Sequence, residues 1–95
     1  MNPSREPNRW ETPITVEIFH VDTPSTFKNF SDLQLAYLWI QSQCSPATNE
    51  EYISSFEDTC TELDFAYTRM GLRASYCVAQ NAYTQYIVYY GVLTI

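Results

Sequence analysis

The chain has 95 residues, of which 45% are hydrophobic and 16% aromatic, and eleven Asp and Glu against five Lys and Arg give it a formal net charge of −6. A disordered chain would carry fewer apolar residues, so we expect one folded domain. Binding to nucleic acid or to anionic membranes relies on Lys and Arg, and the negative charge argues against both functions.

The charge is unevenly distributed along the chain. Residues 31–68 carry seven acidic side chains and no basic one, whereas residues 69–95 carry two basic side chains and no acidic one. A field of this kind repels phosphates and speeds the approach of a basic surface. Either a cationic partner binds the middle of the chain, or its acidic side chains are simply solvated.

Cysteine usage and the N-terminal residues indicate the compartment. Cys44, Cys60 and Cys77 are odd in number and widely spaced, whereas small secreted domains usually carry an even, dense set. Residues 1–12 are too polar for a signal peptide, and the longest apolar run, residues 35–40, is too short to cross a bilayer. These features predict a soluble, cytoplasmic protein.

The N-terminal part of the chain predicts an arm and a strand. Residues 1–12 are polar and contain two prolines, which predicts an extended arm ahead of a single α+β domain over residues 13–95. Residues 14–21 alternate at first, with apolar side chains on one face, and predict a β-strand. We expect a loop over residues 22–29, because Thr-Pro-Ser at 23–25 is typical of a turn.

A first helix is predicted from Ser31 to about Gln43. Ser31 and Gln34 have the spacing of a capping box, and Phe30 and Leu35 lie where a hydrophobic staple would form. The middle of this helix, residues 35–40, is apolar all round. We therefore expect it to be a central and largely buried element.

A second helix is predicted from Thr48 to Met70. Thr48 and Glu51 form another capping box, and Gly71 suits the left-handed position that closes a helix. The apolar stripe of this helix consists of Ile53, Phe56, Cys60, Leu63, Tyr67 and Met70.

The remaining residues predict a β-hairpin, with a strand over 72–78, a turn at 80–82 and a strand over 86–95. Residues 72–83 could instead be helical, since they contain three alanines. With the first strand, the hairpin gives a small two-layer α+β domain of order β-α-α-β-β, an antiparallel sheet packed by two helices. The last strand is apolar on both faces, and two helices can cover only one. Its Tyr-rich face is therefore either a partner surface or is covered by the N-terminal arm.

The sequence contains no pattern typical of catalysis or metal binding. His20 is the single histidine and has no flanking motif, and no Cys-x-x-Cys or His-x-x-His spacing is present. The paired carboxylates at 50–51 and 57–58 belong to neither a cleft nor a calcium loop. We therefore expect a protein that is not an enzyme and needs no cofactor or metal.

The second predicted helix carries the best functional lead, because its acidic residues have no basic partner before Arg69. Six carboxylates between residues 50 and 64 would span roughly 21 Å, about one charge per 3.5 Å, close to the spacing of phosphates along one nucleic-acid strand. The alternative is an acidic face that is simply solvated. The candidate partner-binding acids form two columns on the helix, one of Glu50, Glu57 and Asp64 and a second of Glu51, Asp58 and Glu62. Tyr86 and Tyr90 are the candidate exposed aromatic anchors.

Small size, acidity, aromatic content and the lack of catalytic residues make the chain resemble phage-borne inhibitors of host nucleic-acid machinery, such as anti-CRISPR and antirestriction proteins, and small immunity or antitoxin proteins. The resemblance covers no motif and transfers no functional residue. It implies an inhibitor that occupies a basic nucleic-acid-binding surface of a protein partner, in the host cytoplasm if the gene is phage-borne. The alternative is a structural or assembly protein that self-associates, as a homodimer for example, through its Tyr-rich last strand.

Overall fold

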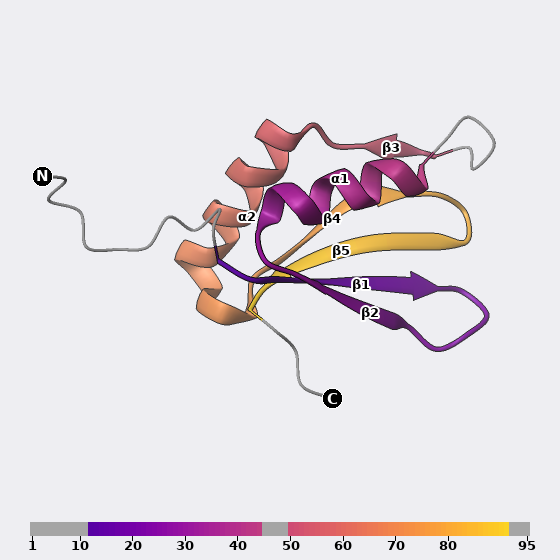
Figure 1. The fold of residues 1–95 in the computed structure, drawn as a ribbon, viewed down its shortest axis with the longest axis horizontal. Helices are drawn as coiled ribbons and strands as arrows, with labels where there is room; N and C mark the ends of the chain where they lie inside the picture. The colour runs from indigo at the N-terminus through magenta and orange to yellow at the C-terminus, as the bar shows by residue number, and fades with distance from the viewer. Residues whose placement is uncertain (1–11, 45–49, 92–95) are drawn as a thin grey trace, which may run out of the picture.

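A computed structural model describes residues 12–44 and 50–91, and within them five strands form one antiparallel sheet with two helices packed on it (Figure 1). The order in the sheet is β2-β1-β5-β4-β3. The strands are β1 (Ile14–His20), β2 (Thr26–Phe30), β3 (Tyr52–Ile53), β4 (Ser75–Gln80) and β5 (Thr84–Tyr90), and the helices are α1 (Leu33–Gln43) and α2 (Phe56–Met70), with a 3₁₀ turn, η2 (Gly71–Arg73), after α2. The predicted α+β class and antiparallel sheet are confirmed, whereas the predicted arm lies almost wholly outside the described residues.

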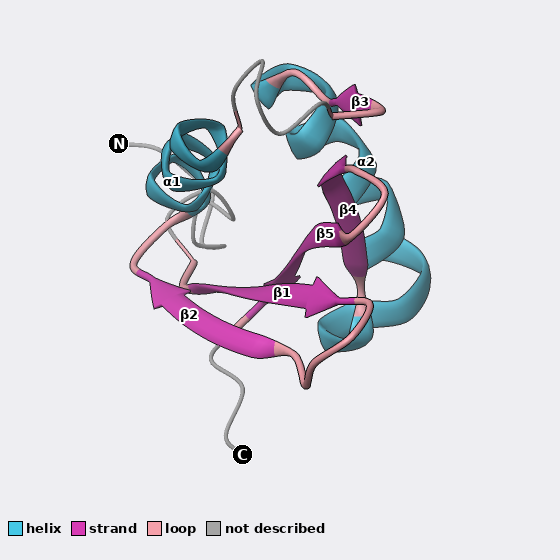
Figure 2. Ribbon diagram, turned by 90° about the vertical axis from the view of Figure 1, so that its right-hand side faces the viewer, coloured by secondary structure: helices cyan, strands magenta, loops and turns pink. Residues whose placement is uncertain are grey.

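Both helices pack against the same face of the sheet. Alternate residues of β1 are buried on this face, as the sequence predicts. The core joins Ile14 and Val16 of β1, Leu33 and Ile40 of α1, and Leu63 of α2, all fully buried. Burial of each such side chain contributes roughly 1.5–3 kcal/mol. The sheet is strongly twisted, so β1 and β4 run in clearly different directions in Figure 2.

Strand β2 corrects the loop predicted over residues 22–29. Its residues pair with β1 in antiparallel register, from Ile14 opposite Phe30 to Ile18 opposite Thr26. The segment Thr-Phe-Lys-Asn-Phe lacks clean alternation, and four of its five residues are exposed. Main-chain pairing with β1 therefore makes this strand, rather than burial of its own side chains.

Helix α1 begins at Leu33, two residues after the predicted start at Ser31, and it is less buried than predicted. Asp32, not Ser31, caps it, because an Asp32 carboxylate oxygen accepts from the Leu35 amide at 2.8 Å. Leu35 is 48% exposed and Leu38 is 50% exposed, so the expectation of burial all round is wrong. One sheet face can cover only one side of a helix, and residues on the other side remain in solvent.

Helix α2 begins at Phe56, so the helix predicted from Thr48 is wrong over its first part. Ser55 is the cap, and its hydroxyl accepts from the Asp58 amide at 3.0 Å. Thr48 lies outside the described residues. Tyr52 and Ile53 form β3 instead of helix, opposite Gln80 and Ala79 of β4. Tyr and Ile favour strands, and the edge of β4 gives their main chain a partner that a helix would forgo.

The C-terminal hairpin is confirmed, with its strands at Ser75–Gln80 and Thr84–Tyr90, and residues 92–95 of the predicted last strand lie outside the described residues. The helical alternative for residues 72–83 is wrong over Ser75–Gln80, which is β4. The Asn81 side chain makes the turn by accepting from the amides of Tyr83 at 2.8 Å and Thr84 at 2.9 Å. A bulge in β4 places both Val78 and Ala79 in the core. Gly71 closes α2 at φ 62°, as expected.

Candidate functional site

The six predicted carboxylates do not share one helix face. Glu50 and Glu51 precede β3 and are bound to the region of the β4–β5 turn. The side-chain amide of Asn81 donates to the Glu50 carboxylate at 2.7 Å, and the side-chain amide of Gln80 donates to the Glu51 carboxylate at 3.1 Å. The predicted column of Glu50, Glu57 and Asp64 therefore does not form, because Glu50 is not helical.

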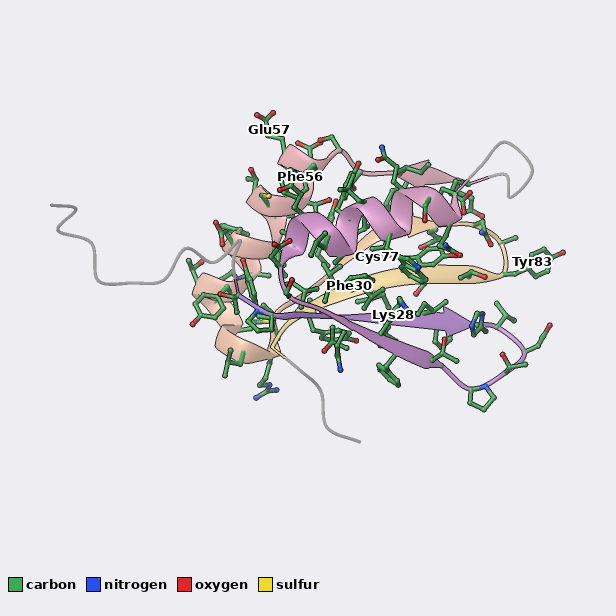
Figure 3. The ribbon with its side chains drawn as sticks, viewed as in Figure 1. Lys28, Phe30, Phe56, Glu57, Cys77 and Tyr83 are labelled. Carbon is green, nitrogen blue, oxygen red and sulfur yellow. The ribbon has the colours of Figure 1, made fainter. Side chains whose placement is uncertain are left out.

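The four acids of α2 lie on two sides of the helix. At about 100° per residue, Asp58 and Glu62 lie within about 60° of Phe65, whereas Glu57 and Asp64 lie about 100–160° from those two acids. Asp64 is half-buried, and its carboxylate accepts from the Tyr90 hydroxyl at 3.0 Å. Glu57, Asp58 and Glu62 are exposed, and Glu57 points away from the sheet (Figure 3).

Tyr86 and Tyr90 are not the exposed aromatic anchors that the sequence predicts. Tyr90 is 3% exposed, and its ring meets Tyr67 of α2 edge to face at 5.3 Å between centroids. Tyr86 is half-buried, and its ring lies 6.1 Å from that of Trp39 in α1. Burial raises the pKa of the Tyr86 hydroxyl. The helices pack on this Tyr-rich face of β5, so Tyr90 is buried and Tyr86 is only partly exposed.

The opposite face of the sheet carries a carboxylate with internal partners. The Tyr89 hydroxyl donates to Glu17 at 2.6 Å, and the Ser25 hydroxyl donates to its other oxygen at 2.8 Å. Burial and the bond to Glu17 raise the pKa of Tyr89 to about 12. These bonds tie β1, β5 and the β1–β2 loop together, so Glu17 has a structural role.

The exposed apolar side chains near the end of α2 are a feature that sequence reasoning missed. Phe65 is 59% exposed, Met70 is 54% exposed and Leu72 of η2 is 71% exposed. Met70 belongs to the predicted apolar stripe and was expected to be covered. The sequence carries no signal for this exposure, because the stripe does not report where the sheet that covers it ends.

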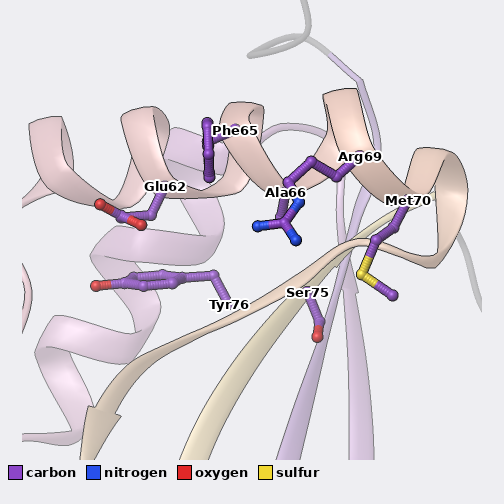
Figure 4. Close-up of a pocket in the computed structure, with 7 residues that line it drawn as sticks. All are labelled: Glu62, Phe65, Ala66, Arg69, Met70, Ser75 and Tyr76. Carbon is purple, nitrogen blue, oxygen red and sulfur yellow. The ribbon is translucent and has the colours of Figure 1, made fainter.

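A groove of about 360 Å³ lies beside these side chains, between α2 and β4 (Figure 4). Its lining consists of Glu62, Phe65, Ala66, Arg69, Met70, Ser75 and Tyr76. Figure 4 shows Glu62 above Tyr76 at one end, Met70 at the other, and the Arg69 side chain between helix and strand. Along α2, Phe65 and Ala66 lie between Glu62 and Arg69, so the groove combines a carboxylate, apolar side chains and a guanidinium, with Tyr76 below Glu62 and Met70 beyond Arg69.

The side chains of the groove are held in place by neighbours. The hydroxyls of Tyr76 and Ser54 are hydrogen-bonded at 2.6 Å, and the Tyr37 hydroxyl donates to the Ser54 carbonyl at 2.7 Å. The Arg69 guanidinium lies 5.6 Å from the centroid of the Phe65 ring, a cation–π contact. Side chains that are already held in place lose little conformational entropy when a ligand binds.

The other residues considered for chemistry lie apart from the groove. His20 ends β1 opposite Thr84, and neither it nor a cysteine lines the groove. The three cysteines are free thiols, and burial raises the pKa of Cys44 and Cys60, which disfavours the thiolate. In residues 12–44 and 50–91, no three His, Cys, Asp or Glu side chains cluster as metal ligands.

Within the part of the chain that the structure describes, neither helix is long and apolar enough to cross a bilayer. Comparison of the chain with protein-family models, with curated proteins and with solved structures gives no match.

Proposed function

We propose that this chain is a non-enzymatic binding protein that uses the groove side of α2 to occupy a basic, nucleic-acid-binding surface of a protein partner and so inhibits it. The observation that carries the proposal is the continuity of exposed carboxylates, Asp58 and Glu62, with exposed apolar side chains, Phe65 and Met70. Protein interfaces combine an apolar centre with a polar, charged rim in this way.

Charge alone would give this surface little affinity. A Lys 4 Å from an exposed carboxylate gains about 1 kcal/mol in water, and measured exposed pairs contribute roughly 0–1 kcal/mol. The acids therefore supply orientation and association rate, while burial of Phe65, Met70 and the Tyr76 ring supplies most of the affinity. This division of roles predicts binding that weakens, but does not vanish, as salt rises.

The support for this proposal differs from that offered by the sequence. Six acids on one rod would have imitated the spacing of phosphates, but Glu50 and Glu51 lie off the helix and Asp64 is bonded to Tyr90. The acidic segment of α2 that remains exposed runs from Glu57 to Glu62, about 7.5 Å of helix axis. A mixed acidic and apolar surface is therefore a better description than a phosphate mimic.

The alternative of self-association through the Tyr-rich last strand lacks support from β5. That strand lies between β1 and β4, and it is paired with β1 over Thr84–Tyr90 and with β4 over Gln85–Tyr89. A second copy would have to use another edge of the sheet. Cytoplasmic location, and inhibition as the outcome of binding, remain parts of the proposal.

The test compares charge reversals on the two sides of α2. Tagged protein captures partners from a cell lysate at low and high salt, and the affinity of the captured partner is measured with purified variants. The double variant D58K/E62K should lose at least tenfold in affinity. The control, E57K, reverses a charge on the other side and should lose less than threefold. Equal losses in both, or none in D58K/E62K across salt concentrations, would contradict the proposal; circular dichroism verifies that all variants fold.

A further inference from the structure

The outer edge of β4 is only partly occupied. Strand β5 pairs with β4 from Ser75 to Gln80, whereas β3 pairs with Gln80 and Ala79 only. The Ser54 amide then donates to the Val78 carbonyl at 2.8 Å before the chain turns into α2. Among the described residues, no strand lies beside Ser75 and Tyr76. An edge of this kind is a template for pairing with a further strand.

The groove runs along this same stretch of edge. Ser75 and Tyr76 form its β4 side, and α2 contributes residues from Glu62 to Met70. Glu62 and Arg69 are separated by about 10.5 Å of helix axis, about three residue steps of extended chain. Two side chains on one face of a strand are an even number of residues apart, so the nearest spacing that fits both charges is four steps, about 13.5 Å. The groove therefore has the length of a short strand lying beside Ser75 and Tyr76.

We propose that this groove receives an extended segment of the partner protein, which adds to β4 as a short antiparallel strand in line with β3. The segment carries a basic residue opposite Glu62, an apolar residue against Tyr76 and Phe65, and an acidic residue opposite Arg69. The inference rests on the proposed function, since the same side of α2 takes part in both, and it names the form of partner that this side binds.

The direction of the segment follows from β3. Because β3 is antiparallel to β4, a strand in line with it runs from the Gln80 end of β4 towards the Ser75 end. Its amino-terminal residue then meets Glu62 and its carboxyl-terminal residue meets Arg69, as the positions in Figure 4 show. Charge complementarity thus requires the order basic, apolar, acidic, because the reverse order would bring like charges together.

A peptide titration tests the proposal on the whole 95-residue chain. Acetyl-Lys-Thr-Val-Thr-Glu-amide is added to ¹⁵N-labelled protein, and amide chemical shifts are followed. The shifts should change at Ser75 and Tyr76 and along α2 from Glu62 to Met70. The peptide with Lys and Glu exchanged should bind at least tenfold more weakly. Shifts located elsewhere, none at millimolar peptide, or equal affinity for both orders would overturn the proposal.

Two further comparisons identify how the peptide is held. The variant E62K/R69E changes exposed side chains and should reverse the preference between the two peptides; an unchanged preference would refute the direction. Successive backbone amides of a strand point to opposite edges, and only one edge of an added strand faces β4. N-methylation of Val in one peptide, and of both Thr residues in another, should therefore abolish binding of one peptide and leave the binding of the other unchanged. Equal effects of both would refute strand addition.

Failure of this inference can be told apart from failure of the proposed function. If neither peptide binds but D58K/E62K still loses the protein partner, strand addition is wrong and the proposed function stands. If D58K/E62K keeps its partner, the proposed function fails whatever the peptides do.

Discussion

Truncation of Leu63 and of Phe65, two residues apart in α2, should lower the stability of the fold by very different amounts. Leu63 is fully buried in the core, whereas Phe65 is 59% exposed beside the groove. Leu63→Ala removes buried methyl groups and leaves a cavity, which should lower the free energy of unfolding by about 2–5 kcal/mol. Phe65→Ala loses an exposed cation–π contact with Arg69 and little else, a cost of about 0.5–1 kcal/mol.

Thermal and urea unfolding, followed by circular dichroism, measure this difference. In a domain of this size 1 kcal/mol shifts the Tm by roughly 4–8 °C, so Leu63→Ala should lower it by about 8 °C or more and Phe65→Ala by a few degrees. Phe65→Ala should nevertheless weaken partner binding, because its ring belongs to the apolar centre of the surface. If Phe65→Ala destabilised the fold as much as Leu63→Ala, Phe65 would be a core residue and the reasoning about this surface would be refuted.

Three further predictions concern α1, the sheet and the end of α2. Asp32→Ala should lower stability to urea by about 0.5–2 kcal/mol through loss of the cap, while Ser31→Ala should change it by less than about 0.5 kcal/mol; equal effects would move the cap. The pKa of Tyr89 is raised to about 12 in the folded state by burial and the bond to Glu17. The stability that the Tyr89 hydroxyl contributes is thus fully present below pH ~10, the unfolded pKa, and is lost as pH rises through about 12. In an absorbance titration, Tyr89→Phe should remove one tyrosine that ionises late; an unchanged number of late-titrating tyrosines would contradict this prediction. A Cβ at Gly71 would meet no atom within 4 Å, but alanine there must adopt φ 62°, ψ −138°. Gly71→Ala should therefore lower the free energy of unfolding in urea by about 1–3 kcal/mol through backbone strain alone, and a neutral result would contradict that geometry.

The parts of the fold that the sequence predicts are those with a strong local signal. Strand β1 alternates cleanly, and the turn at Asn81 makes its bonds within four residues, so both follow from short stretches of sequence. Strands β2 and β3 lie at the two edges of the sheet and expose most of their side chains. An edge strand depends on main-chain pairing with a neighbour, and no pattern within its own residues reports that neighbour.

The start of α2 shows how two adequate local signals compete. Thr48 and Ser55 are both good caps, each followed by an acid three residues later. Pairing of Tyr52 and Ile53 with β4 decides in favour of Ser55, and only the three-dimensional fold supplies that pairing. The same choice moves Glu50 and Glu51 off the helix, which is why the acidic columns were predicted wrongly. The exposure of Phe65 and Met70 could not be predicted either, because it depends on where the sheet ends.

The arrangement of strands constrains any assembly of this protein, whatever its partner. Strand β5 is central, so among the described strands another chain can pair with β2, with the outer edge of the two-residue strand β3 or with the open part of β4. The edge at β2 carries Lys28, whose ammonium lies 5.7 Å from the centroid of Trp39 and 5.8 Å from that of Phe30. A charged lysine in the middle of an edge strand discourages pairing, whereas Ser75 and Tyr76 of β4 present no charge of their own. A self-associating chain and a foreign peptide would therefore compete for the same edge. The charges of Glu62 and Arg69 favour the foreign peptide, which carries both a base and an acid. Strand β2 is the exposed strand that a second copy could offer, and it has a base but no acid.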